Sequence, residues 1–530
     1  MTDKNDAQTS KMEKNSMTRS KIASLYPIVK LIPQIPDTDL SRLISEGLAL
    51  GQANPHVLSA IDKDRDIVAL RKKEARIEDN HWLNTHGRPD LGFDFTESSD
   101  WLDRLELGCG RERMPALMVL VFILIRGYFG GFKDRKTATT LAESRTLEIL
   151  LMNFGIKMPG ASTILDNVNP VTPATLELIL DAQIKRAIFE GLDDFKSLVF
   201  DSTSCAGNTA WPTDSGTVMA LSFRGEHLLR SLHKHGITLR LPAVVQVMLA
   251  TIAELHKRIQ LSAGKKDSAK IRGKLYRKQM KLARKVRKAL DRAHARALGR
   301  VDGLEMVPSQ RRTITKILEL AAEDISNLGV AITNADKRIN KDIKVDTKDK
   351  IVSLSDDDAA MIVKGQRDPI VGYKPQIGRS ENGFITAIIV PMGNAADSSQ
   401  LRPIVDASIK RTGVTPSTLS FDDGYTNAKD REHYLGIGIK IVSFSGSKGK
   451  NIIPAEDYDS IAYKKARNDR SAVESLMFTL KHNYDLDRMM RRGIDNVRAE
   501  MLEKAIAYNF FRLIRLRKNA EKERLAKLAA

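Results

Sequence analysis

Three acidic side chains stand where phosphodiester chemistry would need them. Asp201 ends a strand-like apolar run at 198–200, Asp422 ends a second such run at 418–421, and Glu474 lies in a stretch of helical periodicity. Carboxylates that converge on two divalent metal ions form a minimal set for cutting and rejoining phosphodiester bonds. Carboxylate oxygens suit Mg²⁺ or Mn²⁺ rather than zinc. The sequence therefore predicts these three residues as catalytic ligands of Mg²⁺, with Mn²⁺ as the alternative ion.

Two basic residues accompany Glu474 on the same predicted helix. Arg470 lies four residues before it and Lys481 seven after it, so all three project from one face. One interpretation is that both cations hold DNA phosphates beside the scissile bond. The other is a solvated face with an Arg470–Glu474 ion pair, which contributes only about 0.3–0.5 kcal/mol.

The surrounding pattern indicates an α/β fold that could bring the carboxylates together. Parallel strands end at the same edge of a sheet, and a helix that crosses this edge can add a third carboxylate. Upstream, 115–129 predicts a buried helix and 136–155 a single amphipathic helix. After the run before Asp201, strands are predicted at 368–377, 383–393, 415–423 and 437–444.

One segment carries most of the excess positive charge. Residues 265–300 contain 15 Lys or Arg against two Asp, in a chain whose net charge is +19. Apolar residues recur there at spacings of three, four and seven, which predicts an amphipathic helix with a basic face. We expect this face to bind a DNA backbone, although a solvated arm or a docking helix for an acidic partner fits the same pattern. The predicted contacts are Lys281, Arg284, Lys285, Arg287 and Lys288.

Composition narrows the class of protein. The length of 530 residues gives room for several domains with a real core. Cys109 and Cys205 offer no disulfide framework, the longest apolar run (115–125) is too short to span a bilayer, and no signal-peptide pattern begins the chain. We therefore expect a soluble intracellular protein with a polyanionic partner.

Taken together, the motifs resemble the DDE-type transposases of bacterial insertion sequences, whose catalytic domain has a ribonuclease-H-like fold. The stretch 201–216 is similar to an unclassified, ISNCY-like group in which Asp-Ser/Thr-Thr precedes Asn and then Pro-Thr-Asp-Ser. The stretch 421–427 is similar to the Asp-x-Gly-Tyr of that superfamily. Arg470, Glu474 and Lys481 match its Tyr-x2-Arg-x3-Glu-x6-Lys signature, and Arg467 stands at the Tyr position.

The resemblance implies a role for each matching residue. Asp201, Asp422 and Glu474 would be the three catalytic carboxylates, and Asp422 is preferred over Asp423 because it precedes x-Gly-Tyr. Arg470 and Lys481 would contact phosphates at the transposon ends. Arg467 departs from the family pattern, which removes a stacking Tyr but leaves a cation that could touch phosphate.

The implied organisation has six segments. The catalytic core is an α/β domain of ribonuclease-H-like type, a mixed sheet flanked by helices, which is interrupted by a helical insertion and preceded by a helical region. That preceding region either reads DNA through a helix-turn-helix or is a plain helical bundle. The segments are a disordered 1–20, a helical 21–192, the first core part 193–225, a basic insertion 226–350, the remaining core 351–510 and a basic tail 511–530.

The predicted function is a DNA transposase that cleaves the ends of its own insertion element and joins the 3′-hydroxyl to target DNA by two-metal chemistry. Joining two ends needs two active sites, so a homodimer or larger assembly on DNA is expected. The resemblance also implies double-stranded DNA as the partner and a cytoplasmic, nucleoid-associated location in bacteria. Two alternatives stay open: a catalytically inactive, transposase-derived DNA-binding protein, and a metal-dependent nuclease on the same fold.

Overall fold

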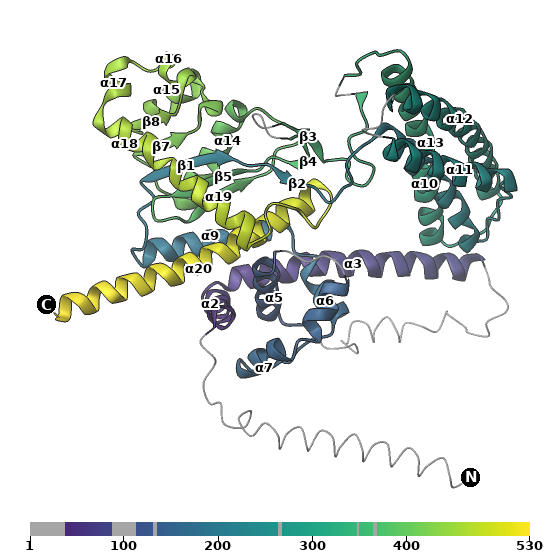
Figure 1. Cartoon of the computed structure of the whole chain (residues 1–530). Coiled ribbons are helices and arrows are strands. Elements are labelled where there is room, and N and C mark those ends of the chain that lie inside the picture. Colours follow the sequence, from purple (N-terminus) through teal and green to yellow (C-terminus); the bar gives the residue numbers. More distant parts are fainter. Residues whose placement is uncertain are drawn as a thin grey trace, which may run out of the picture.

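The chain forms an α/β core, a layer of helices against it and a separate helical module (Figure 1). A computed structural model describes residues 38–86, 113–130, 135–262, 268–346, 349–363 and 368–529. The predicted disordered segment 1–20 lies outside these residues. Among the described helices, none combines the length and apolar character needed to cross a membrane.

A mixed five-stranded sheet forms the centre of the core, with the strand order β6-β5-β1-β7-β8. The central strand β1 is antiparallel to β5 and parallel to β7, and β8 continues the parallel side. Parallel strands require crossover connections: α14 (Asp397–Thr412) leads from β6 to β7, and α15 (Ala428–Gly436) leads from β7 to its neighbour β8. This architecture is compatible with the predicted α/β class. The strands are β1 (Ser197–Ser202), β5 (Gln376–Ser380), β6 (Ile385–Ile389), β7 (Thr418–Phe421) and β8 (Ile441–Phe444).

Both faces of the sheet are covered, because successive side chains on each strand point to opposite sides. Val199 on β1 joins the core shared with α19 (Ser471–Asn483) and α20 (Ile494–Ala529), whereas Leu198 and Phe200 join the core on the other face. Three short helices connect β8 to α19. They are α16 (Ser447–Ile452), α17 (Ala455–Asp459) and α18 (Ile461–Asp469).

The predicted single strand at 368–377 is wrong, because this segment contributes to two sheets. Its first half is β4 (Ile370–Tyr373), the middle strand of a small sheet with β2 (Cys205–Ala206) and β3 (Ala360–Ile362). Its second half begins β5 of the main sheet. Pro375 stands between them, and a proline lacks the N–H needed to continue a ladder.

The described part of the N-terminal region is a series of helices joined by short connections. The predicted buried helix at 115–129 is confirmed as α5 (Ala116–Tyr128). The predicted single helix at 136–155 is wrong, since Ser144 accepts a hydrogen bond from the Leu147 amide and begins a new helix there. The other helices are α2 (Asp39–Ala53), α3 (Pro55–His86), α6 (Arg135–Ala142), α7 (Arg145–Asn153), α8 (Ala161–Val168) and α9 (Pro173–Phe189).

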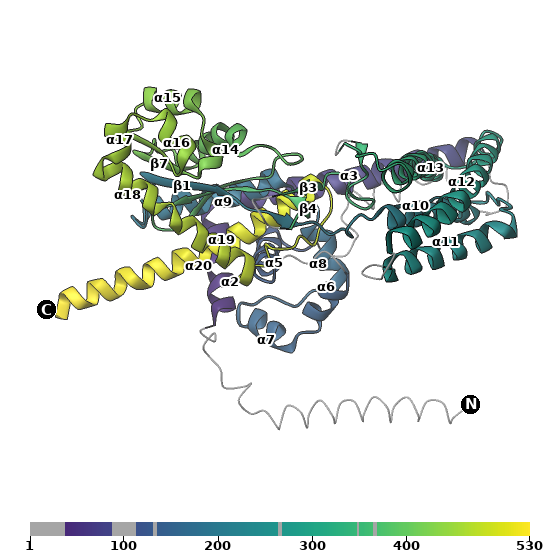
Figure 2. The same ribbon diagram turned by 45° about the horizontal axis from the view of Figure 1, so that its top comes forward.

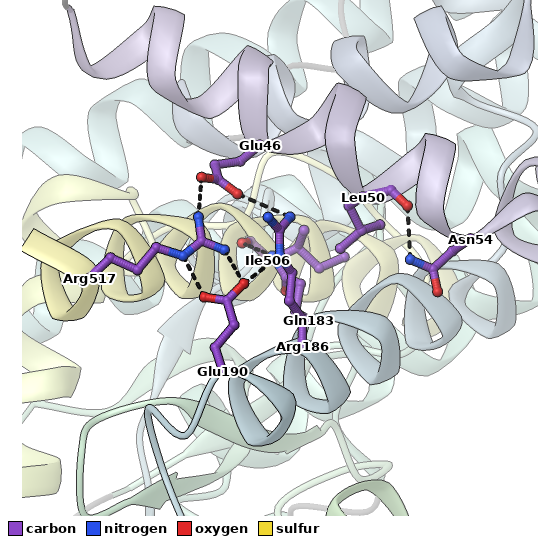
Figure 3. A network of polar contacts seen from close by, with 8 residues as sticks. All are labelled: Glu46, Leu50, Asn54, Gln183, Arg186, Glu190, Ile506 and Arg517. Carbon is purple, nitrogen blue, oxygen red and sulfur yellow. Dashed lines mark hydrogen bonds and ion pairs between the residues drawn. The ribbon is translucent and has the colours of Figure 1, made fainter. Parts of the chain in front are cut away.

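Helix α20 joins the N-terminal helices to the sheet. It runs without a break from 494 to 529, across the predicted boundary between the core (351–510) and the tail (511–530). On one side Asn509 exchanges hydrogen bonds with the backbone of Ile385 on β6. On the other side Arg517 pairs with Glu46 of α2 and with Glu190 at the end of α9 (Figure 3). Arg186 contacts the same two carboxylates at 3.1 and 2.9 Å. Three elements distant in sequence are thus tied together.

The helical module has a hydrophobic core of its own. It begins at Asp214, earlier than the predicted insertion start at 226, and stands apart from the sheet in both ribbon views (Figures 1 and 2). The long helix α3 reaches it, where Asp79 accepts a hydrogen bond from the Ser309 amide at 2.8 Å. Its main helices are α10 (Asp214–Ser231), α11 (Ala243–Leu261), α12 (Ser268–Val301) and α13 (Pro308–Asn340).

A fully buried ionic cluster lies where α5 meets α20. Glu503 accepts a hydrogen bond from Arg126 at 2.5 Å and another from Arg491. Burial alone would raise the pKa of Glu503, but the two guanidinium groups outweigh it and hold the pKa below its ordinary value. A buried charge that loses its partners is strongly destabilising, so this cluster makes the contact between the two helices depend on all three residues.

Replacing Glu503 with Gln should lower the free energy of unfolding by about 3–5 kcal/mol, because two buried guanidinium groups lose their counter-charge. The difference between wild type and variant should shrink below pH 4.5, the ordinary pKa of this carboxyl group. The ionised Glu503 stabilises the folded wild type, and this stabilisation is lost as pH falls from 4.5 through the lower pKa of the folded state. Urea denaturation followed by circular dichroism measures both effects. Glu521→Gln on the exposed part of α20 is the control and should change stability by less than about 0.5 kcal/mol. Equal losses in the two variants would contradict this account.

Candidate active site

Strand register brings Asp201 and Asp422 to one edge of the sheet. Phe200, Phe421 and Phe444 are direct neighbours across β1, β7 and β8. Their rings stack, with centroids 5.1 Å apart for the first pair and 5.5 Å for the second. Because the three strands run in the same direction, Asp201 and Asp422 follow their phenylalanines side by side at the carboxyl edge.

Glu474 reaches this edge from α19, and Arg470 contacts all three carboxylates. The Nη1 atom of Arg470 lies 3.6 Å from Asp201 Oδ2 and 3.9 Å from Asp422 Oδ1. Its Nη2 atom donates a hydrogen bond to Glu474 Oε1 at 2.6 Å. Three negative charges therefore share one positive charge, which leaves this edge attractive to further cations.

Asp201 and Glu474 differ in their access to solvent. The Asp201 side chain is 13% exposed, whereas Asp422 is 44% and Glu474 58% exposed. Asp201 also accepts a hydrogen bond from the Ser202 amide at 2.7 Å, which fixes its orientation. The site thus has one fixed carboxylate on β1 and two accessible ones.

The neighbouring aspartates 422 and 423 have different partners. Asp422 accepts a hydrogen bond from the Ser445 hydroxyl at 3.2 Å and faces Arg470. Asp423 turns away and accepts a hydrogen bond from the Gly449 amide, in the first turn of α16, at 3.0 Å. A carboxylate bound to amides at a helix start is a capping group. The geometry therefore favours Asp422 as the residue available for chemistry.

A buried hydrogen-bond network below the site holds the turn that carries Asp422. Tyr425 is fully buried and donates to Gln376 Oε1 at the start of β5. Gln376 in turn donates to Asp397 at 3.1 Å, and Lys374 pairs with Asp397 at 2.9 Å. Lys374, Gln376 and Asp397 were not predicted from the sequence. The Gly-Tyr pair after Asp422 was the signal that the sequence offered for this network. Lys374, Gln376 and Asp397 are distant from Tyr425 in sequence and come together with it only in the folded chain.

The remaining predicted residues of this region lie near the edge with partners of their own. Lys481 donates to the Ser204 carbonyl at 3.1 Å and lies 3.7 Å from Asp487, so it contacts the loop that follows β1. Arg467 lies in the last turn of α18, with its guanidinium 4.9 Å from the centroid of the Tyr458 ring.

The basic helix of the module is α12, whose apolar face packs into the core of the module. Its five predicted DNA contacts are exposed, and Arg287 also donates to the Ile325 carbonyl of α13 at 3.1 Å. Arg287 is thus partly committed to its neighbouring helix. The other four present their charge to solvent: Lys281, Arg284, Lys285 and Lys288.

The carboxylate edge has the donor chemistry for Mg²⁺ or Mn²⁺, since it offers oxygen ligands only. Within the described ranges, however, no group of three or more His, Cys, Asp or Glu side chains is close enough to hold one metal ion. Arg470 lies among the carboxylates and supplies the neutralising charge that a metal would otherwise provide. Metal binding would therefore need Arg470 to move away and the carboxylates to approach one another.

The chain is similar in part to a known protein family. Residues 362–510 match the family model of the transposase DDE domain. The matched segment includes Asp422, Arg470, Glu474 and Lys481. It begins after Asp201, which lies before the helical module in the chain. Neither curated proteins nor solved structures include a significant match to this chain. The family match supports a DDE-type transposase, as the resemblance of the motifs implied.

Proposed function

We propose that this chain is a DNA transposase that cuts the ends of its own insertion element and joins the freed 3′-hydroxyl to target DNA. One observation carries the proposal: the carboxylates of Asp201, Asp422 and Glu474 all contact the guanidinium of Arg470. The transposase match at 362–510 supports it from the sequence side. We accordingly assign the mixed sheet to the ribonuclease-H-like type.

We assign metal binding to the same three carboxylates, with Mg²⁺ as the expected ion and Mn²⁺ as a substitute. When bound, such ions activate the attacking oxygen and stabilise the leaving oxygen of a phosphodiester. Asp201 is the most fixed of the three, since it is held by the Ser202 amide and mostly buried. Tyr425 and the network below it keep Asp422 in place through the intervening turn.

The cations near the edge would position the DNA. Arg470 is close enough to the carboxylates that a phosphate at the scissile bond could compete for its guanidinium, in a charge-assisted and bidentate contact. Such a contact would release the carboxylates for metal. Lys481 and Arg467 flank the edge and could hold adjacent phosphates, while the exposed face of α12 adds contacts farther away.

Several further properties belong to the proposal. The substrate is double-stranded DNA, both the terminal repeats of the element and the target. Two ends must be joined, so the active species is a homodimer or larger assembly on DNA. Such a protein would work in the bacterial cytoplasm at the nucleoid. An inactive descendant is less well supported, because an inactive site would have no reason to keep three carboxylates gathered on one guanidinium.

Replacing Asp422 with Asn should abolish Mg²⁺-dependent cleavage of element ends, because a metal ligand loses its charge, while binding to the ends persists. Asp201→Asn and Glu474→Gln should behave in the same way. Cleavage of labelled ends and gel-shift titrations measure the two properties separately.

Asp423→Asn is the matched control, because an amide oxygen at this position can still accept the hydrogen bond from Gly449. We expect this variant to cleave at close to the wild-type rate. If Asp423→Asn is inactive and Asp422→Asn is active, the assignment of the second carboxylate is wrong.

Replacing the five basic residues of α12 with Gln should weaken binding to DNA of any sequence. Each lost phosphate contact lowers the magnitude of the salt slope by about 0.9, so a loss of up to about 4 to 5 is expected. Arg287 should contribute least because it also binds the Ile325 carbonyl. Fluorescence anisotropy between 50 and 200 mM salt, roughly the range in which such contacts weaken, gives the slope. An unchanged slope would assign α12 to protein contacts or solvent.

A further inference from the structure

A groove lies on the opposite flank of α19 from Arg470. It has a volume of about 840 Å³ and is bounded by α19 and α20, with the ends of α5 and the start of α2 at its rim. Ala472, Ser475 and Thr479 of α19 line it, so it runs along the same stretch of helix as Glu474. Three arginines line the same groove: Arg379 on β5, and Arg512 and Arg515 on α20.

Two of these arginines converge on the turn between β5 and β6. Gly383 lies there at φ 93°, and a Cβ atom on it would lie 2.8 Å from Arg512 Nε and 3.3 Å from Arg379 Nη2. The two guanidinium groups therefore rest against the same glycine. A side chain at position 383 would have to displace them, and L-residues rarely adopt this φ.

This arginine cluster outnumbers the two carboxylates that also line the groove, Asp39 and Asp485. Burial lowers the pKa of Arg379 and of Arg512, and a neighbouring guanidinium lowers each further. Tyr508 and then Asp193 act in the opposite direction on both pKa values, and Asp193 is also occupied by hydrogen bonds from Ser380 and the Asn382 amide. In the part of the chain that the structure describes, none of the three arginines forms an ion pair with a carboxylate.

Exposed aromatic rings connect the catalytic edge to this groove. Glu474, Phe478 and His482 follow one another at intervals of four residues along α19, so they share a face. Phe478 is 65% exposed although it is a large apolar side chain, and its ring centroid lies 4.2 Å from that of His482. His482 also lines the groove. Aromatic rings of this kind are surfaces on which nucleic-acid bases stack.

We propose that the groove between α19 and α20 binds the sugar-phosphate backbone of a DNA strand that leaves the catalytic edge, with Arg379, Arg512 and Arg515 as its phosphate contacts. This inference rests on the proposed function, because it needs DNA at that edge. Planar guanidinium groups bind phosphate in bidentate fashion. The strand would pass over Phe478 and His482 on its way from Glu474. The site is separate from α12 and lies on the core itself.

A segment of the chain itself is a poorer occupant. The groove begins near Asp39, so residues 1–37 are the closest in sequence that could enter it. These residues hold six Lys or Arg against four Asp or Glu. A net positive segment does not complement three arginines, whereas a phosphodiester backbone does.

The test compares two variants with the same change in charge. Arg379, Arg512 and Arg515 are replaced together with Gln in one variant, and Lys518, Lys522 and Lys527, exposed on the same helix α20, in the other. The probe is a 30-base-pair duplex of arbitrary sequence, because phosphate contacts do not depend on sequence. The arginine variant should lower the magnitude of the salt slope by about 2 to 3, at about 0.9 for each contact, and the lysine variant should not. An equal fall in both, or none in a folded arginine variant, overturns the proposal.

A second measurement covers the case in which the triple variant unfolds. Arg515 is exposed, so Arg515→Gln alone should fold and lower the slope by about 0.9. A photo-crosslinking amino acid at Thr479 should link the chain to the duplex. Crosslinks only between protein chains, or an Arg515→Gln slope equal to wild type, would reject the DNA groove. Cleavage of element ends by these variants is measured separately. The proposal of a DNA-binding groove can therefore be rejected without rejecting the carboxylate site or the proposed function.

Discussion

Mutual repulsion among three carboxylates is the constraint on which the rest of the site depends. Two like charges about 4 Å apart cost about 1 kcal/mol in water and about 4 kcal/mol at a protein surface. The folded chain offsets this cost with one guanidinium, since Arg470 contacts Asp201, Asp422 and Glu474. That compensation is incomplete, with three negative charges against one positive. The edge is therefore held together in a form that favours further cations, and DNA phosphate is a natural competitor for Arg470.

The scaffold explains how such unfavourable neighbours are brought together. The stacked phenylalanines of β1, β7 and β8 fix the strand register, and the buried Tyr425 anchors the turn that follows β7. Helix α20 packs between the sheet and the N-terminal helices, and it contacts those helices through the buried Glu503 cluster and the Arg517 ion pairs. The energy that holds the carboxylates in place comes from these apolar and buried ionic contacts, which lie outside the site.

Sequence patterns predicted the strands and the three carboxylates because both signals are local: an apolar run followed by an acidic residue, and a helical spacing. Arg470 was expected either to bind phosphate or to pair with Glu474, but its contacts with Asp201 and Asp422 arise only when β1, β7 and α19 meet. The same limit applies to Lys374, Gln376 and Asp397. Two wrong predictions had a local signal in the sequence. Pro375 marks the break between β4 and β5, and Ser144 caps the start of α7. Both were overlooked because the hydrophobic pattern on either side continues without interruption.

The most direct test of the central claim is strand joining, because a nuclease on the same fold would cut DNA without joining it. Precleaved element ends are incubated with the protein, target DNA and either Mg²⁺ or Mn²⁺, and the products are separated on a denaturing gel. A transposase must retain the 3′-hydroxyl end after cleavage, so we expect ends covalently joined to target DNA, with less product for Arg470→Ala and Lys481→Ala. If preparations that cut the correct ends never join them with either ion, the transposase assignment is contradicted and the nuclease alternative replaces it.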